Sequence, residues 1–184
     1  SENDGFNRLL MAAGLELSEI IVLRAYCRYL LQTGLPFSQA SMERVLATHG
    51  AITRQLAQLF SAQFQLETSD KLRAKQSAKL DGAIVKSLAA VRNADDDRIL
   101  RAYLLAIRAT LRTNYHQTLA DGAPKPWLSL KFDPQRLPDL PLPRPKFEIF
   151  VYSPRVEGVH LRMGYVARGG IRWSDRREDF RTEV

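Results

Sequence analysis

Seven of the nine prolines of this 184-residue chain lie in the stretch APKPWLSLKFDPQRLPDLPLPRP, residues 123–145. Because proline fixes φ and has no amide hydrogen, neither a helix nor a central strand is expected to run through this stretch. Apolar side chains alternate within it, between Trp127 and Phe132, which predicts a short extended piece docked against a core. We therefore predict a proline-rich linker or strap over residues 121–146, with a domain boundary close to it.

The region before the strap, residues 1–120, shows the spacing of helices. Residues 51–66 carry apolar side chains at intervals of three and four, which is the pattern of an amphipathic helix. Gly14 is placed to end the first helix in a left-handed cap. A last helix is predicted to begin at the carboxylates Asp95–Asp97 and to run through Tyr115. We predict an all-α domain here.

The period changes after the strap, where residues 147–152 alternate in the manner of a β-strand. Glu157-Gly158 is predicted to make a turn, and Val159–Tyr165 a second strand. Residues 147–166 are therefore interpreted as a β-hairpin. Because an isolated two-stranded hairpin is only marginally stable, we expect it to pair with more sheet.

The hairpin is predicted to end at Gly169-Gly170, and a helix is predicted to begin at Ser174 or Asp175. This helix reaches the last residue of the sequence without a capping glycine, so we interpret the chain as part of a longer protein. The predicted fold class is α+β, mainly α. It comprises a multi-helix domain, the proline-rich linker, and then a β-hairpin and an incomplete helix that begin an α/β domain.

The net charge is +7, from 27 lysines and arginines against 20 acidic side chains. This balance favours anionic partners, without choosing among nucleic acids, phosphates and carboxylates. The charges are dispersed, with no run of five like charges, which argues against a nucleic-acid partner. Apolar runs stay well short of the roughly 18 residues of a membrane helix, and no signal-peptide pattern opens the sequence. A cytoplasmic protein with no membrane partner is expected.

Metal sites and the usual nucleotide sites are not predicted in this chain. The single cysteine, Cys27, excludes an internal disulfide and a multi-thiolate zinc site. The three histidines, His49, His116 and His160, lie far apart in the sequence. Neither GxGxxG nor GxxxxGK[ST] occurs, so the chain by itself is not expected to hold NAD, FAD or ATP in the usual way. No residue is assigned as catalytic.

One dense group of chemistry-bearing residues follows the hairpin, in the run ARGGIRWSDRR, residues 167–177. Gly169 and Gly170 would let the backbone approach a ligand closely. They are flanked by Arg168 and Arg172, and guanidinium groups bind carboxylates through two parallel hydrogen bonds. These four residues form a candidate pocket for a dicarboxylate or a phosphate. The alternative interpretation is a tight turn with solvated arginines.

The run FVYSPRVEGVHLRMGYVARGGIRWSDRREDFRTEV, residues 150–184, resembles the beginning of the catalytic domain of the large NAD-specific glutamate dehydrogenases, and the close match covers about residues 145–184. It is similar, more distantly, to the glycine-glycine segment of the small hexameric glutamate dehydrogenases. The helical region, with the opening DGFNRLLMAAGL at residues 4–15, also resembles the segment that precedes catalysis in the large enzymes. The resemblance implies oxidative deamination of L-glutamate to 2-oxoglutarate and ammonia, with NAD as the hydride acceptor. In the small enzymes a lysine precedes the paired glycines and binds the substrate's carboxylate, and Arg168 occupies that place here. Arg172 is either a second ligand or an anchor of the loop through an ion pair, and the anchor is favoured.

The resemblance also implies groups outside this chain. The family's catalytic lysine and aspartate, and its dinucleotide-binding domain, lie downstream of the matching segment. NAD is therefore expected to be bound by a downstream domain, and the chain alone is expected to be inactive. The family suggests a homo-oligomer, in which residues 147–184 begin the catalytic domain. The alternative function is a basic helical interaction module that binds nucleic acid or a protein partner.

Overall fold

The computed structural model describes residues 4–173, 181 and 184. These residues form two compact units, which are described separately. The helical unit comprises residues 4–27 and 37–107, and the sheet unit comprises residues 28–36 together with the described residues from 108 onward.

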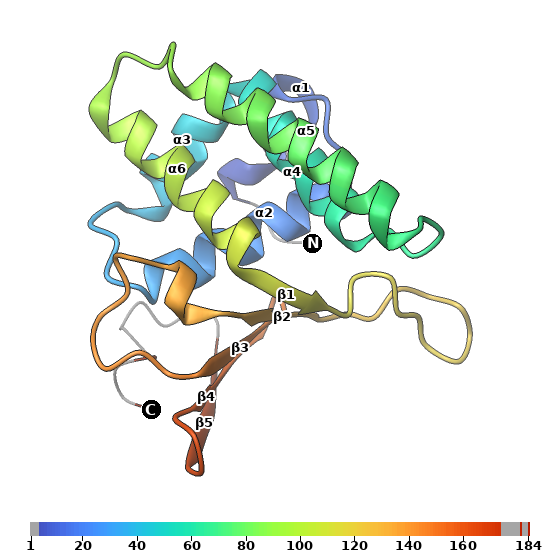
Figure 1. Cartoon of the computed structure of the whole chain (residues 1–184), viewed down its shortest axis with the longest axis vertical. Coiled ribbons are helices and arrows are strands. Elements are labelled where there is room, and N and C mark those ends of the chain that lie inside the picture. The colour runs from blue at the N-terminus through green and yellow to red at the C-terminus, as the bar shows by residue number, and fades with distance from the viewer. Residues whose placement is uncertain (1–3, 174–180, 182–183) are drawn as a thin grey trace. The chain divides into compact units, whose positions relative to one another are not determined.

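Helices make up about half of the described chain. After a short 3-10 helix, η1 (Gly5–Arg8), the α-helices are α1 (Leu9–Ala12), α2 (Leu17–Leu31), α3 (Gln39–Thr48), α4 (Gly50–Phe64), α5 (Asp70–Leu88) and α6 (Ala94–Ala109). In the helical unit α4 and α5 pack side by side (Figure 1). The amphipathic helix predicted for residues 51–66 is confirmed as α4.

Local signals set several helix ends. Gly14 has φ +63°, the left-handed conformation predicted for the end of the first helix. The hydroxyl of Ser38 caps α3 by accepting a hydrogen bond from the Ser41 amide at 3.2 Å. The side chain of Ser69 caps α5 in the same way, from the amide of Leu72. Each cap satisfies an amide that has no partner within its own helix.

The last predicted helix is shorter than expected, and the prediction of an all-α region over residues 1–120 is wrong at this point. Helix α6 ends at Ala109, and strand β1 (Thr110–Thr113) follows directly. Thr110 pairs with Phe132, a residue 22 positions later in the chain. This long-range pairing outweighs the helical spacing that continues to Tyr115, because backbone ladders override weak local propensities.

The sheet unit contains an antiparallel meander. After β1, its strands are β2 (Leu128–Phe132), β3 (Phe147–Tyr152), β4 (Val156–Arg162) and β5 (Ala167–Trp173). They lie in the order β1-β2-β3-β4-β5, and each pair of neighbours is antiparallel (Figure 1). The mixed α+β, mainly helical class is therefore confirmed for the described residues.

The extended piece predicted within the proline-rich strap is confirmed as β2. The expectation that no central strand runs through the strap is wrong, because β2 pairs with β1 on one side and with β3 on the other. Its five residues contain no proline, so each keeps a backbone amide for the ladder. The side chains of Leu128, Leu130 and Phe132 are buried. The ring of Tyr29, in the last turns of α2, stacks on Phe132 with 4.0 Å between centroids and 10° between planes. Tyr29 also meets Phe150 of β3 at 5.6 Å. These aromatic contacts form the core of the sheet unit.

Two local predictions for the hairpin are wrong. Glu157-Gly158 was expected to form the turn, but both residues lie inside β4. The turn comes earlier, where the Ser153 hydroxyl accepts a hydrogen bond from the Val156 amide at 2.9 Å. This side-chain hydrogen bond stabilises a turn at residues 153–156, which the alternation of apolar residues did not predict.

The second error concerns the paired glycines. Gly169 and Gly170 were expected to end the hairpin, but they pair with His160 and Val159 inside β5. Glycine is unfavourable within a strand, yet an edge strand with a complete ladder on one side accommodates it. The helix predicted to begin at Ser174 or Asp175 lies outside the described residues.

Candidate functional site

The four candidate residues lie on strand β5, where alternate side chains point to opposite faces of the sheet. Arg168, Gly170 and Arg172 share one face, and Gly169 shares the other with Ile171. The structure therefore brings the two arginines to one face of a strand, rather than to a loop that flanks the glycines. We call this the arginine face.

The arginine face of β5 continues across the sheet. Leu161 of β4 lies opposite Arg168, and Glu148 of β3 lies opposite Leu161. At the other end of β5, Glu157 lies opposite Arg172. Two glutamates therefore share this face with the two arginines.

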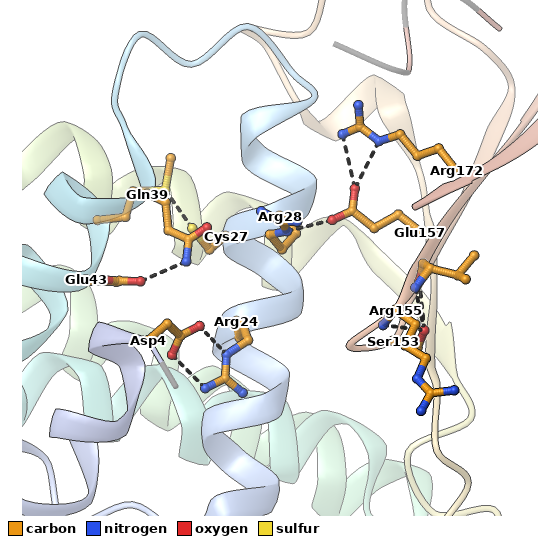
Figure 2. A network of polar contacts seen from close by, with 12 residues as sticks. Asp4, Arg24, Cys27, Arg28, Gln39, Glu43, Ser153, Arg155, Glu157 and Arg172 are labelled. Atoms are coloured by element: carbon orange, nitrogen blue, oxygen red, sulfur yellow. Dashed lines mark hydrogen bonds and ion pairs between the residues drawn. The ribbon is translucent and has the colours of Figure 1, made fainter. Parts of the chain in front are cut away.

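Glu157 is the centre of an ion-paired cluster (Figure 2). One of its carboxylate oxygens accepts a hydrogen bond from Nη2 of Arg172 at 3.1 Å, and the other accepts one from Nε of Arg28 at 2.6 Å. The side chain of Glu157 is 1% exposed and that of Arg172 is 9% exposed. Because a buried carboxylate is costly unless it is paired, the two arginines stabilise its charged form.

This cluster supports the interpretation of Arg172 as an anchor. The ion pair holds β5 to β4, and it also reaches α2 through Arg28. The role of Arg172 as a second ligand of a substrate stays a prediction.

Arg168 has different surroundings. It lines a pocket of about 470 Å³, together with prolines 141, 143 and 145 of the strap, Leu161 and Arg181. The side chain is exposed, and no ion pair joins it to any residue that the structure describes. Among the four candidates, Arg168 is thus the cation available to a ligand in a largely apolar pocket.

The glycines have separate structural roles. A Cβ atom on Gly169 would lie 3.0 Å from the carbonyl oxygen of Val159 and 3.1 Å from His160 Cδ2, so a side chain there would crowd β4. Gly170 lies between Arg168 and Arg172 on the arginine face. The two glycines therefore act on opposite faces of β5.

A second cation, Arg181, was missed by the sequence analysis. Its Nε donates to Glu148 at 2.9 Å, and its backbone amide donates to the side chain of Gln32 at 3.1 Å. The sequence analysis also did not identify Glu148 and Glu157. The sequence signal that could have found Glu148 is its spacing, because it lies two and four residues before the buried rings of Phe150 and Tyr152, on the same face of β3. A carboxylate in phase with buried aromatic residues needs a cation partner.

The described residues offer no group of three or more His, Cys, Asp or Glu side chains that could hold a metal ion. In the same part of the chain, no helix has the length and apolar character needed to cross a membrane.

Two family models match the chain. Residues 83–184 match the model described as "Bacterial NAD-glutamate dehydrogenase, catalytic domain", and residues 1–66 match "Glutamate dehydrogenase, helical motif 3". All of β5 and the pocket lie within the first match. The second match covers helices α1 to α4.

Curated relatives are similar over the whole chain. It is 52% identical to the NAD-specific glutamate dehydrogenase of Pseudomonas aeruginosa, 50% identical to that of Mycobacterium tuberculosis and 47% identical to that of Halomonas elongata. Each alignment covers 100% of this chain, but only 12%, 11% and 11% of the respective relatives. The chain therefore spans about an eighth of the length of the proteins it resembles.

Proposed function

Because the chain belongs to the bacterial NAD-specific glutamate dehydrogenases, we propose that it contributes a carboxylate-binding arginine, Arg168, to their glutamate site. The reaction is the oxidative deamination of L-glutamate to 2-oxoglutarate and ammonia, with NAD as hydride acceptor. The observation that supports this role is the position of Arg168, which lines the 470 Å³ pocket without an ion-pair partner among the described residues.

The chemistry of the pocket suits one carboxylate of a small substrate. A guanidinium group offers parallel N–H donors to both oxygens of a carboxylate. Apolar neighbours such as Pro143 and Leu161 line the pocket beside the guanidinium group. A volume of about 470 Å³ falls in the usual range for small-molecule sites. Gly170, on the same face of β5 as Arg168, places no side chain beside the proposed ligand.

The described residues do not fit NAD. Their sheet is an antiparallel meander, whereas dinucleotide sites are built from parallel strands joined by crossover helices, with a glycine-rich turn at a helix N-terminus. We therefore propose that the chain's role is substrate binding and that hydride transfer belongs to other parts of the enzyme. Alone, this chain is expected to catalyse no turnover. In the complete enzyme, we propose that it works as part of a homo-oligomer.

The test places this chain in a complete dehydrogenase. The corresponding segment of the Pseudomonas aeruginosa enzyme is replaced by residues 1–184, and glutamate-dependent NAD reduction is measured. Arg168→Ala is expected to raise KM for glutamate about tenfold or more, since a hydrogen-bonded charge pair contributes about 1.5–3 kcal/mol. Arg168→Lys is expected to recover part of the loss, because it keeps the charge but not the paired donors.

The matched control is Arg162→Ala. Arg162 is an exposed arginine of β4 whose side chain lies on the face opposite Leu161. It is expected to leave KM unchanged. Equal KM values for Arg168→Ala and the unsubstituted chimera would rule out the proposed role of Arg168.

A further inference from the structure

Strand β5 lacks the apolar pattern that normally sets the register of a strand. Its large apolar side chains, Ile171 and Trp173, are 77% and 62% exposed. Two of its seven residues are glycines, and its arginine face carries no apolar side chain. Among the described residues, β5 also lies at the edge of the sheet, with one neighbouring strand. Register is weakly specified in glycine-rich strands without a buried apolar face.

We propose that Glu157 is a positioning residue that sets the register of β5, and thereby the face of the sheet on which Arg168 lies. Glu157 and Arg172 are direct cross-strand partners, and their ion pair is almost completely buried. This side-chain interaction on the arginine face ties one residue of β5 to one residue of β4. The consequence for substrate binding rests on the proposed function, but the register itself does not.

A slip of one residue would break this arrangement completely. It would move every side chain of β5 to the opposite face, because side chains alternate with a period of two. Arg172 would leave Glu157 for the exposed face, and Arg168 would leave the pocket. A slip of two residues toward the start of β5 would place Gly170 opposite Glu157, which also removes the ion pair. Both alternatives leave the buried carboxylate without its β5 partner.

Arg28 allows the role of Glu157 to be separated from a general loss of stability. Its Nε binds the other oxygen of Glu157 from α2, outside the sheet (Figure 2). Removing Arg28 therefore breaks one ion pair of the same buried carboxylate but leaves the link between β4 and β5. Removing Arg172 breaks that link and leaves Glu157 paired with Arg28.

The register is read by NMR on the 184-residue chain, through cross-strand NOEs. In the unsubstituted chain the backbone of Gly158 is expected to show NOEs to Ile171, and Val156 to Trp173, as the register requires. Glu157→Gln and Arg172→Gln are expected to lose these β4–β5 NOEs, while NOEs between Phe150 and Val159 persist. Arg28→Gln is expected to retain both sets. Asp133→Asn, which removes the carboxylate of a more exposed ion pair in the same unit, is the matched control.

Retention of the Gly158–Ile171 NOEs in both Glu157→Gln and Arg172→Gln would overturn the inference. If Glu157→Gln does not fold, the NOEs of Arg172→Gln alone test the inference. In Arg172→Gln the buried carboxylate of Glu157 stays paired with Arg28, so this variant is expected to fold. Loss of the β4–β5 NOEs in Arg28→Gln to the same extent would also overturn it, since a general loss of stability would then explain the result.

The chimeric dehydrogenase separates this inference from the proposed function. Glu157→Gln is expected to raise KM for glutamate in the direction of Arg168→Ala, with a smaller effect on kcat. A lost register with an unchanged KM would contradict the role of Arg168 in glutamate binding and leave the register role of Glu157 standing. If the β4–β5 register is unchanged in both Glu157→Gln and Arg172→Gln, the inference is overturned whatever the value of KM for glutamate.

Discussion

Arg181 Nε lies 2.9 Å from a carboxylate oxygen of Glu148, and the two side chains are 8% and 0% exposed. This pair joins β3 to a residue 33 positions later in the chain. Water cannot compensate either charge at such burial, so the ion pair stabilises both side chains. The same guanidinium also lines the pocket beside Arg168.

Arg181→Ala is expected to lower the free energy of unfolding by about 3 kcal/mol, because it leaves Glu148 as a buried carboxylate without its arginine. Arg181→Ala combined with Glu148→Leu is expected to recover much of this loss. Urea unfolding followed by circular dichroism measures both. A loss below about 1 kcal/mol, the value for exposed pairs, would show that the ion pair does not stabilise the sheet unit.

Tyr29→Ala is expected to destabilise the protein by about 3–5 kcal/mol, since it removes a buried ring that stacks on Phe132 and meets Phe150. Tyr29→Phe keeps the ring and is expected to retain most of the stability. The two variants are compared by chemical denaturation. If both lose equally, the hydroxyl rather than the stacked ring would account for the contribution of Tyr29.

A paired glycine experiment tests two different backbone positions. Gly82→Ala in the interior of α5 is expected to stabilise the protein by about 0.5–1 kcal/mol, because a Cβ there meets nothing within 4 Å. Gly14→Ala is expected to destabilise it by about 1–2 kcal/mol. Gly14 has φ +63°, and its Cβ would lie 2.6 Å from Arg54 Nη2. Thermal unfolding should shift in opposite directions for the two variants, and shifts of the same sign would contradict this account.

The helical unit is expected to lose stability in acid through Asp96. Burial raises the pKa of Asp96, but hydrogen bonds from His49 and Arg44, at 2.9 and 3.0 Å, outweigh it and hold the pKa below 3.8. Because the folded-state pKa is lowered, this contribution is present above the unfolded-state value near 3.8. It disappears as the pH falls through the lower folded-state pKa.

Asp96→Asn is therefore expected to be less stable than the unsubstituted chain at neutral pH, with a smaller dependence of stability on pH below 3.8. Urea denaturation at a series of pH values measures this difference. Asp97→Asn, which changes a carboxylate of the same helix turn that pairs with Arg101, is the control. A parallel pH dependence in Asp96→Asn and the unsubstituted chain would contradict the role of Asp96.

The features that the sequence predicted well depend on neighbouring residues. The left-handed cap at Gly14, the amphipathic helix α4 and the alternating strand β2 all follow from a few consecutive side chains. Such features need only the chirality of the backbone and the period of the apolar residues. The assignment of Arg168 as a candidate ligand came from a local motif and a family resemblance, and it stays a prediction.

The tertiary structure decided the features that depend on residues far apart in the chain. Thr110 lies in strand β1 because it pairs with Phe132 of β2. Gly169 lies within β5 because its backbone pairs with that of His160 in β4. The buried carboxylates of Glu148 and Glu157 became stable because Arg181, Arg28 and Arg172 reach them across the sheet unit. A local pattern could not show these partners, because the free energy of a buried charge depends on what folding places beside it.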